Sequence, residues 1–179
     1  MNIIVDCEST GPIPNLYSLI EIGAVAILKD KSFSTFHINI APINNNFDPG
    51  ALEAIGLTME DINSKERNNA EPKQAMEEFR KWILDLTCQN KYRPTFFSDN
   101  NGYDFAWINY YFHYYLGSNP FGFSSRRIGD IWAGLVKDVH KPWKQLRDSP
   151  HDHNSLHDAI GNAEVLIKFQ EQYGLRINF

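Results

Sequence analysis

Three β-rich segments lie within the first 40 residues, and no other feature of the 179-residue chain constrains its fold as strongly. Residues 3–7 form a short apolar run that ends in acidic side chains, residues 17–28 are β-rich, and residues 33–40 alternate apolar and polar side chains. The polar residues 29–32 separate the last two segments, where a hairpin turn is expected. The chain therefore starts with strands, of which the first is buried.

Helical patterns alternate with further strands in the rest of the chain. Pro49 can begin a short helix and Gly56 can end it, while Thr58 and Asp61 form a capping pattern for a second one. Apolar residues spaced three and four apart predict helices over 72–86, 103–116 and 155–173, and apolar runs predict strands over 94–98 and 124–130. This order predicts an α/β fold with a mixed five-stranded sheet flanked by helices, its antiparallel part first. Without a repeat or a linker, residues 1–179 are expected to form a single domain.

Composition excludes several classes of protein. The formal net charge of −5 argues against a protein that coats nucleic acid by bulk charge, although carboxylate-bound cations could supply local positive charge. Six basic residues between Arg126 and Arg147 are either an ordinary solvated face or a track for a phosphate backbone. No signal peptide is expected from the first residues, no apolar run could span a membrane, and two cysteines make no disulfide framework. A cytoplasmic protein without membrane contact is expected.

Asp6 and Glu8 are the first candidates for chemistry. Residues two apart in a strand point to the same face, so both carboxylates project together while Cys7 points the other way. Two carboxylates at the end of a buried strand repel each other unless a counter-charge is present. A divalent cation such as Mg²⁺ or Mn²⁺ suits oxygen ligands. The alternative is that the strand has already ended and both side chains are solvated.

Two later segments also carry polar groups. Asp104 falls in the first turn of the helix over 103–116, where an acidic residue could equally complement the helix dipole. Residues 151–159 hold three histidines and Asp158, but the spacing lacks the glutamate of the zinc pattern H-E-x-x-H. His153 could be a loop residue without a role, and surface positions are expected for His151 and His157.

The order and spacing of these segments closely resemble the DEDDh 3′-to-5′ exonucleases, the superfamily of ribonuclease T and proofreading exonuclease subunits. The match runs from Ile3 to about Leu166 and looks most like compact bacterial or phage exoribonuclease-like members. Its three motifs are Asp6-Cys7-Glu8-Ser9-Thr10-Gly11, then Asn100, Tyr103, Asp104, Trp107 and Ile108, and finally His153, Leu156, Asp158 and Ala159. Histidine at position 153, where the oligoribonuclease branch has tyrosine, argues against that branch.

The resemblance implies a ribonuclease H-like fold and a mechanism with two divalent metal ions, Mg²⁺ or Mn²⁺. It implies that Asp6, Glu8 and Asp158 bind the first ion, that Asp6 bridges to the second, and that Asp104 completes the site. His153 is the implied general base for hydrolysis of the terminal phosphodiester bond, which releases a nucleoside 5′-monophosphate. Thr10 and Gly11 are expected beside the terminal nucleotide. Phe105 is a candidate for base stacking, whereas Trp107 is expected in the core.

The expected substrate is the 3′ end of single-stranded nucleic acid, RNA before DNA. A DNA exonuclease, free-standing or a proofreading subunit, is the second hypothesis. A nucleic-acid-binding module without activity is the third, and the presence of all five implied catalytic residues disfavours it. The aromatic residues 110–115 would suit a helix packed on both sides, which leaves a homodimer open.

Overall fold

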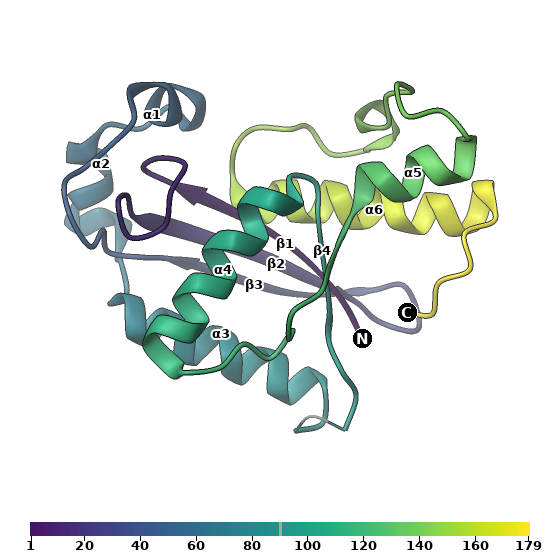
Figure 1. Cartoon of the computed structure of the whole chain (residues 1–179), viewed down its shortest axis with the longest axis horizontal. Coiled ribbons are helices and arrows are strands. Elements are labelled where there is room, and N and C mark those ends of the chain that lie inside the picture. The colour runs from purple at the N-terminus through teal and green to yellow at the C-terminus, as the bar shows by residue number, and fades with distance from the viewer. Residues whose placement is uncertain (90) are drawn as a thin grey trace.

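The computed structural model describes residues 1–89 and 91–179, and within them it contains the predicted mixed five-stranded sheet (Figure 1). The strand order is β3-β2-β1-β4-β5. The strands are β1 (Asn2–Ser9), β2 (Leu19–Ile27), β3 (Phe33–Asn39), β4 (Thr95–Ser98) and β5 (Ser125–Arg127). β1, β2 and β3 pair antiparallel, whereas β4 pairs parallel with β1 and with β5. The antiparallel part therefore comes first, as predicted.

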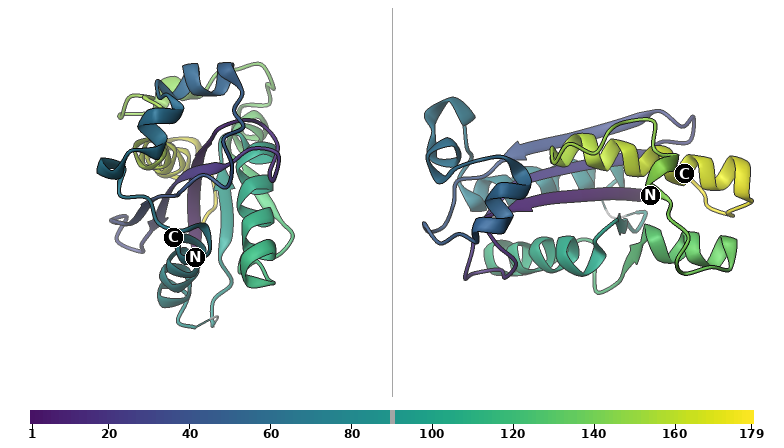
Figure 2. Two further views of the ribbon diagram at one scale, coloured as in Figure 1. Left: turned by 90° about the vertical axis from the view of Figure 1, so that its left-hand side faces the viewer. Right: turned by 90° about the horizontal axis from the view of Figure 1, so that it is seen from above.

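Helices cover both faces of this sheet. They are α1 (Pro49–Ile55), α2 (Met59–Asn63), α3 (Pro72–Leu86), α4 (Asn101–Leu116), α5 (Ile128–Val136) and α6 (Ser155–Tyr173). Short 3₁₀ helices span Lys65–Arg67 and Lys144–Leu146. Seen from above, the strands lie between α4 on one side and α6 on the other (Figure 2). Within the described residues, no helix is both long and apolar enough to cross a membrane.

Most predicted helix ends are confirmed. Pro49 begins α1, and Gly56 ends it in the left-handed conformation (φ 66°) that glycine adopts without strain. Thr58 and Asp61 form a complete capping box on α2. The prediction of a strand over 124–130 is wrong in its second half, because α5 begins at Ile128.

The alternation of β1 determines where its acidic residues point. Ile3, Val5 and Cys7 pack in the core between the sheet and helices α3 and α4, which also contains the fully buried Trp107. Ile4 packs in the opposite core, against α6. Asp6 and Glu8 share the alternation of Ile4, so the sequence correctly placed Cys7 on the other face.

Gly23 on β2 allows the start of α6 to contact the sheet. A Cβ atom added there would lie 2.2 Å from the backbone nitrogen of Leu156. We expect Gly23→Ala to lower the free energy of unfolding by about 1–3 kcal/mol, at the upper end of that range because the clashing atoms are backbone. Gly102→Ala is the matched control, since an added Cβ in α4 meets open space and alanine favours helix. Urea unfolding measures both; equal stability of the two variants would contradict the close contact.

Candidate active site

Three carboxylates from distant parts of the chain meet at one end of the sheet. Asp6 and Glu8 come from β1, and Asp158 comes from the first turn of α6. One oxygen of each lies within 4.8 Å of the others. The side chain of Asn154 caps α6 by accepting a hydrogen bond from the His157 backbone, which fixes the turn that carries Asp158. The site therefore depends on where α6 begins.

Glu21 fixes that position, and the sequence prediction missed it. Its side chain, buried in β2, accepts hydrogen bonds from the Ser155 backbone nitrogen (3.2 Å) and Oγ (2.7 Å). Burial alone would raise the pKa of Glu21, but hydrogen bonds from His37 and Ser155 and the Arg67 charge lower it. An acidic residue inside the apolar run 19–24 was the available signal, because a buried charge needs partners.

Asp104 is buried in the first turn of α4, with 2% of its surface exposed. Its Oδ1 accepts a hydrogen bond from the Cys7 thiol at 3.5 Å, and its Oδ2 has no hydrogen-bond partner within the described residues. Burial raises the pKa of Asp104 to about 7, although hydrogen bonds from Cys7 and Ser98 counteract part of that shift. Among the described residues, the carboxylates whose oxygens all lie within 4.8 Å of one another are those of Asp6, Glu8 and Asp158, and Asp104 is not one of them.

The carboxylates repel one another. Burial raises the pKa of Asp6 well above its ordinary value, and the charges of Asp104 and Glu8 raise it further. Burial, with the charges of Glu21 and Asp158, raises the pKa of Glu8 to about 8. Such shifts mean that folding brings together negative charges that lack compensation, which is typical of cation-binding and catalytic sites.

Asp158 has a positively charged neighbour that the sequence prediction did not identify. Arg147 donates a hydrogen bond to Asp158 Oδ1 at 3.1 Å, and the side chains of the pair are 4% and 1% exposed. His151 Nδ1 lies 2.5 Å from the same oxygen. Asp158 Oδ2 is buried and has no hydrogen-bond partner in the described part of the chain. One oxygen of Asp158 is thus occupied and the other is available.

His153 lies in the loop before α6, exposed and in the left-handed region with φ 57°. Its ring centroid is 4.4 Å from that of His151. A ligand atom of each lies within 4.8 Å of an Asp158 oxygen. His151 is exposed as predicted, yet it contacts Asp158 directly. His157, also exposed, bonds Asp152 instead.

Thr10, Gly11 and Phe105 make contacts within the chain. Thr10 Oγ1 donates to the Asn46 carbonyl at 2.8 Å and accepts from the Ser18 backbone at 3.0 Å. Gly11 packs so closely on the Tyr17 ring that an added Cβ would lie 2.4 Å from it. Phe105 is half-buried, and its ring packs edge-on to Phe96 at 5.2 Å between centroids. These contacts explain the residues structurally and leave their roles toward a nucleotide as predictions.

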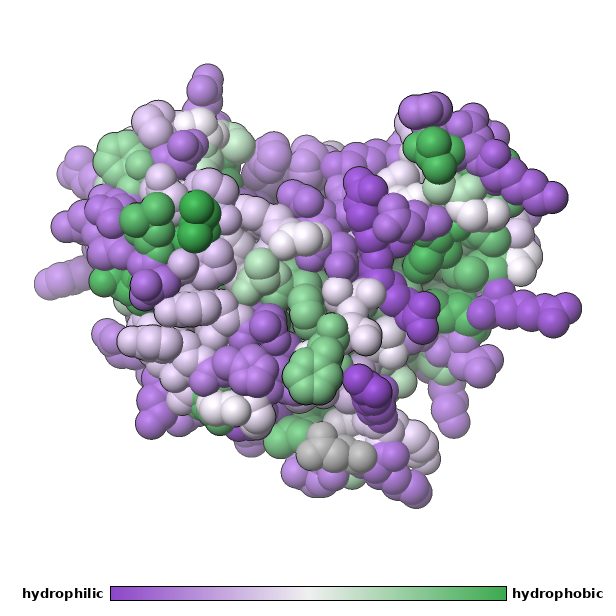
Figure 3. All heavy atoms as spheres, viewed as in Figure 1, coloured by the Kyte–Doolittle hydropathy of each residue, from purple (hydrophilic) through white to green (hydrophobic). Residues whose placement is uncertain are grey.

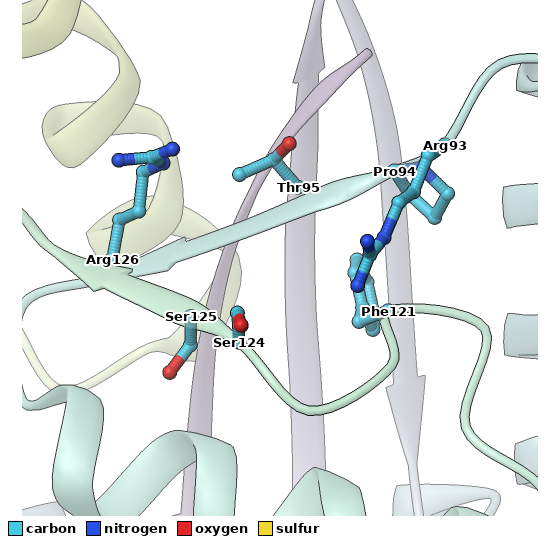
Figure 4. A pocket seen from close by; sticks show the side chains of 7 residues that line it. All are labelled: Arg93, Pro94, Thr95, Phe121, Ser124, Ser125 and Arg126. Carbon is cyan, nitrogen blue, oxygen red and sulfur yellow. The ribbon is translucent and has the colours of Figure 1, made fainter.

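A separate hollow lies at the start of β4 and β5, away from the strand ends that adjoin the acidic residues (Figure 4). It has a volume of about 430 Å³ and is lined by Arg93, Pro94, Thr95, Phe121, Ser124, Ser125 and Arg126. In Figure 4 Arg93 extends along Phe121, whereas Arg126 extends to the opposite side of the strands, so their guanidinium groups do not converge. The hollow therefore lacks the focused charge of an anion site.

Comparison with known proteins identifies the family. Residues 3–166 match the family model described as exonuclease, RNase T type. The chain is 36% identical over 174 residues to the 3′-5′ DNA exonuclease Cap18 of Escherichia coli, covering 91% of this chain and 88% of the relative.

Solved structures show the same fold. The cell-death related nuclease 4 (CRN-4) superposes with a TM-score of 0.72 and 14% identity, covering 94% of this chain and 63% of that one, so the chain spans less than two thirds of that nuclease. A 3′-exonuclease whose structure concerns 3′-end specific recognition of a histone mRNA stem-loop superposes with a TM-score of 0.68 and 19% identity. The match covers 98% of this chain and 84% of that one. These likenesses confirm the ribonuclease H-like fold. The family model and the 36% identical relative show that the chain belongs to the RNase T-type exonuclease family of the DEDDh superfamily and is a 3′-to-5′ exonuclease.

Proposed function

We propose that the chain, as a single exonuclease domain, removes nucleotides from the 3′ end of single-stranded nucleic acid by a divalent-metal mechanism. The observation that carries the proposal is the convergence of Asp6, Glu8 and Asp158, whose oxygens lie within 4.8 Å of one another. Carboxylates from two elements are brought together there despite their repulsion, which folding alone does not require.

The residues fit a hard divalent cation such as Mg²⁺ or Mn²⁺. All three ligand groups are carboxylates, and the free oxygen of Asp158 is buried without a hydrogen-bond partner in the described residues. Asp6, Glu8 and Asp158 would bind the first cation. Asp6 would also contact a second cation, and Asp104 would complete the ligands of the site directly or through water. Two cations would supply Lewis-acid stabilisation of the negative charge that develops on the phosphate oxygens.

His153 is proposed as the general base. Its loop position and exposure let the imidazole reach a water molecule near Asp158. The ring would accept the proton of that water as the water oxygen attacks the terminal phosphorus. An imidazole is the side chain that most often takes up a proton in this way. The bond from phosphorus to the O3′ atom of the preceding nucleotide breaks, so the product is a nucleoside 5′-monophosphate.

The loops beside Thr10 are proposed to bind the terminal nucleotide. Thr10 bonds the Asn46 carbonyl, and the Asn46 side chain bonds the Leu16 carbonyl, so the two loops are joined. Ile13, Leu16 and Phe47 on these loops are about half exposed. We propose that these exposed apolar side chains contact the face of a base. On the face drawn in Figure 3, apolar patches are separated by hydrophilic surface.

The sugar preference stays a prediction. Resemblance to exoribonuclease-like members favours RNA, whereas the name of the 36% identical relative favours DNA as the second candidate. We therefore propose a substrate panel of matched RNA and DNA oligonucleotides, 5′-labelled and resolved to one nucleotide, with Mg²⁺ or Mn²⁺. Stepwise shortening from the 3′ end that stops with a chelator is expected. Internal cleavage, or activity that persists in the chelator, would refute the proposal.

His153→Ala is expected to reduce kcat on the order of 10²- to 10⁴-fold, the usual contribution of a general base. Mn²⁺ affinity measured without substrate should change little, because the carboxylates remain. His157→Ala is the matched control, since its ring bonds Asp152 at the surface. Unchanged turnover in His153→Ala would assign the proton transfer to another group.

A further inference from the structure

The Arg147 side chain is a buried cation whose two terminal guanidinium nitrogens both have polar partners. One guanidinium nitrogen donates to Asp158 Oδ1 at 3.1 Å and lies 3.2 Å from His151 Nδ1, while the other lies at 2.5 Å from Asn162 Oδ1. The guanidinium stacks 5.5 Å from the centre of the Trp143 ring, and Gly161 leaves room for its aliphatic stem. A planar group with contacts at both terminal nitrogens and on one face has a fixed orientation.

The two hydrogen-bond acceptors of Arg147 on α6 lie one turn apart. Asp158 and Asn162 are four residues apart, so their side chains share one helix face. Arg147 reaches this face from the 144–147 segment. Its planar guanidinium contacts Asp158 Oδ1 with one terminal nitrogen and Asn162 Oδ1 with the other. Asp158 Oδ1 is therefore occupied, and only Oδ2 is free for another ligand.

Burial distinguishes a positioning role from contact with substrate. The Arg147 side chain is 4% exposed, and its Nε is enclosed without a hydrogen-bond partner in the described residues. A guanidinium that binds a phosphate directly needs donors open to the substrate. Here the donors are directed at α6.

We propose that Arg147 is a positioning residue that fixes the Asp158 carboxylate so that Oδ2 is presented to a divalent cation. The inference rests on the proposed function, because it takes Asp158 as a ligand. Groups that hydrogen-bond a ligating carboxylate determine its orientation, and their loss typically costs about 10–100-fold in metal affinity or activity.

The experiment is a Mn²⁺ titration of substrate-free protein, with free Mn²⁺ followed by electron paramagnetic resonance. Arg147→Gln is expected to weaken Mn²⁺ binding about 10–100-fold. Arg147→Lys keeps the positive charge but lacks the two guanidinium donors, so it should weaken Mn²⁺ binding to an intermediate extent. Lys141→Gln is the control, because it removes a positive charge from an exposed position in the same part of the chain. Unchanged or tighter binding in Arg147→Gln would overturn the proposal.

Two further measurements separate the alternatives. Kinetics of Arg147→Gln should show a lower kcat at fixed Mn²⁺ with KM for the oligonucleotide within twofold. A raised KM with unaltered Mn²⁺ affinity would make Arg147 a phosphate ligand and overturn the positioning role. If Arg147→Gln fails to fold by circular dichroism, Arg147→Lys and Asn162→Ala decide by the same titration. Asp6→Asn is included because Mn²⁺ binding that survives it would refute the proposed function itself, whatever the Arg147 variants show.

Discussion

Asp6→Asn is expected to remove nearly all turnover and, at the same time, to raise the thermal stability of the cation-free protein. The carboxylate lies in the group with Glu8 and Asp158, so its loss removes a proposed ligand shared by both cations. We expect kcat to fall on the order of 10³-fold, as for the loss of a preorganised electrostatic group. Single-turnover cleavage of a labelled oligonucleotide at saturating Mg²⁺ measures this.

The gain in stability has an electrostatic cause. Burial and the charges of Asp104 and Glu8 raise the pKa of Asp6, which means that its charged form destabilises the folded state. The amide has similar size and no charge. Each kcal/mol of repulsion removed corresponds to about 2–4 °C in Tm for a chain of this length. A lower Tm for Asp6→Asn in the presence of chelator would show that Asp6 stabilises the fold and is not held there for a ligand.

Asp61→Asn provides a matched control for that measurement. Asp61 is also acidic, but it completes the capping box of α2, and hydrogen bonds from Thr58 lower its pKa. Its replacement should reduce stability slightly, because the amide is a weaker partner for Thr58, and should leave turnover unchanged. Opposite signs for the two substitutions would distinguish a repelling carboxylate from a stabilising one.

Local patterns predicted much of this fold because they act over short distances. Pro49, Gly56 and the Thr58 capping box fix helix ends through contacts within a few residues. Helix α5 was missed for the opposite reason. Its sequence IGDIWAGLV is short, contains two glycines and β-branched residues, and is typical of a strand. It is helical here because Trp132 stacks on Phe169 of α6 at 5.0 Å, a contact that the local sequence does not reveal.

The same distinction applies to the site. Asp6 and Glu8 share a strand face by geometry alone, so their pairing was predictable. Arg147 could be recognised only as part of a basic stretch, since its role depends on Asn162 and Trp143, which fold next to it. His153 was identified through a motif, whereas the contact of His151 with Asp158 depends on the path of the loop before α6. Contacts between distant segments are what the sequence left open.

Stability of the cation-free protein is expected to fall as pH rises from about 5.5 to 8.5. The pKa of Asp104 is raised to about 7 and that of Glu8 to about 8, from ordinary values of 3.8 and 4.5. A group with a raised pKa in the folded state contributes stability below its unfolded pKa and loses that contribution as pH passes through the folded value. Shifts of this size correspond to several kcal/mol between the two ends of the range.

The chosen range separates these groups from acidic residues whose pKa is lowered. Asp61, Glu66 and Asp152 have lowered pKa values, so they contribute stability above pH 4.5 and lose it only in acid. Their contributions are constant between pH 5.5 and 8.5. The measurement is urea unfolding in chelator across that range, repeated with saturating Mg²⁺.

Mg²⁺ should remove most of the decline, because a bound cation favours the charged carboxylates that high pH creates. Glu8→Gln should flatten the cation-free profile while retaining the part due to Asp104, since the amide does not titrate. If stability instead rose with pH in chelator, the carboxylates would have to be compensated from within the chain. The charge of Arg147, which already pairs with Asp158, would then extend its compensation to Asp6 and Glu8. The sign of this slope therefore tests whether the acidic cluster is complete without a cation or is built to receive one.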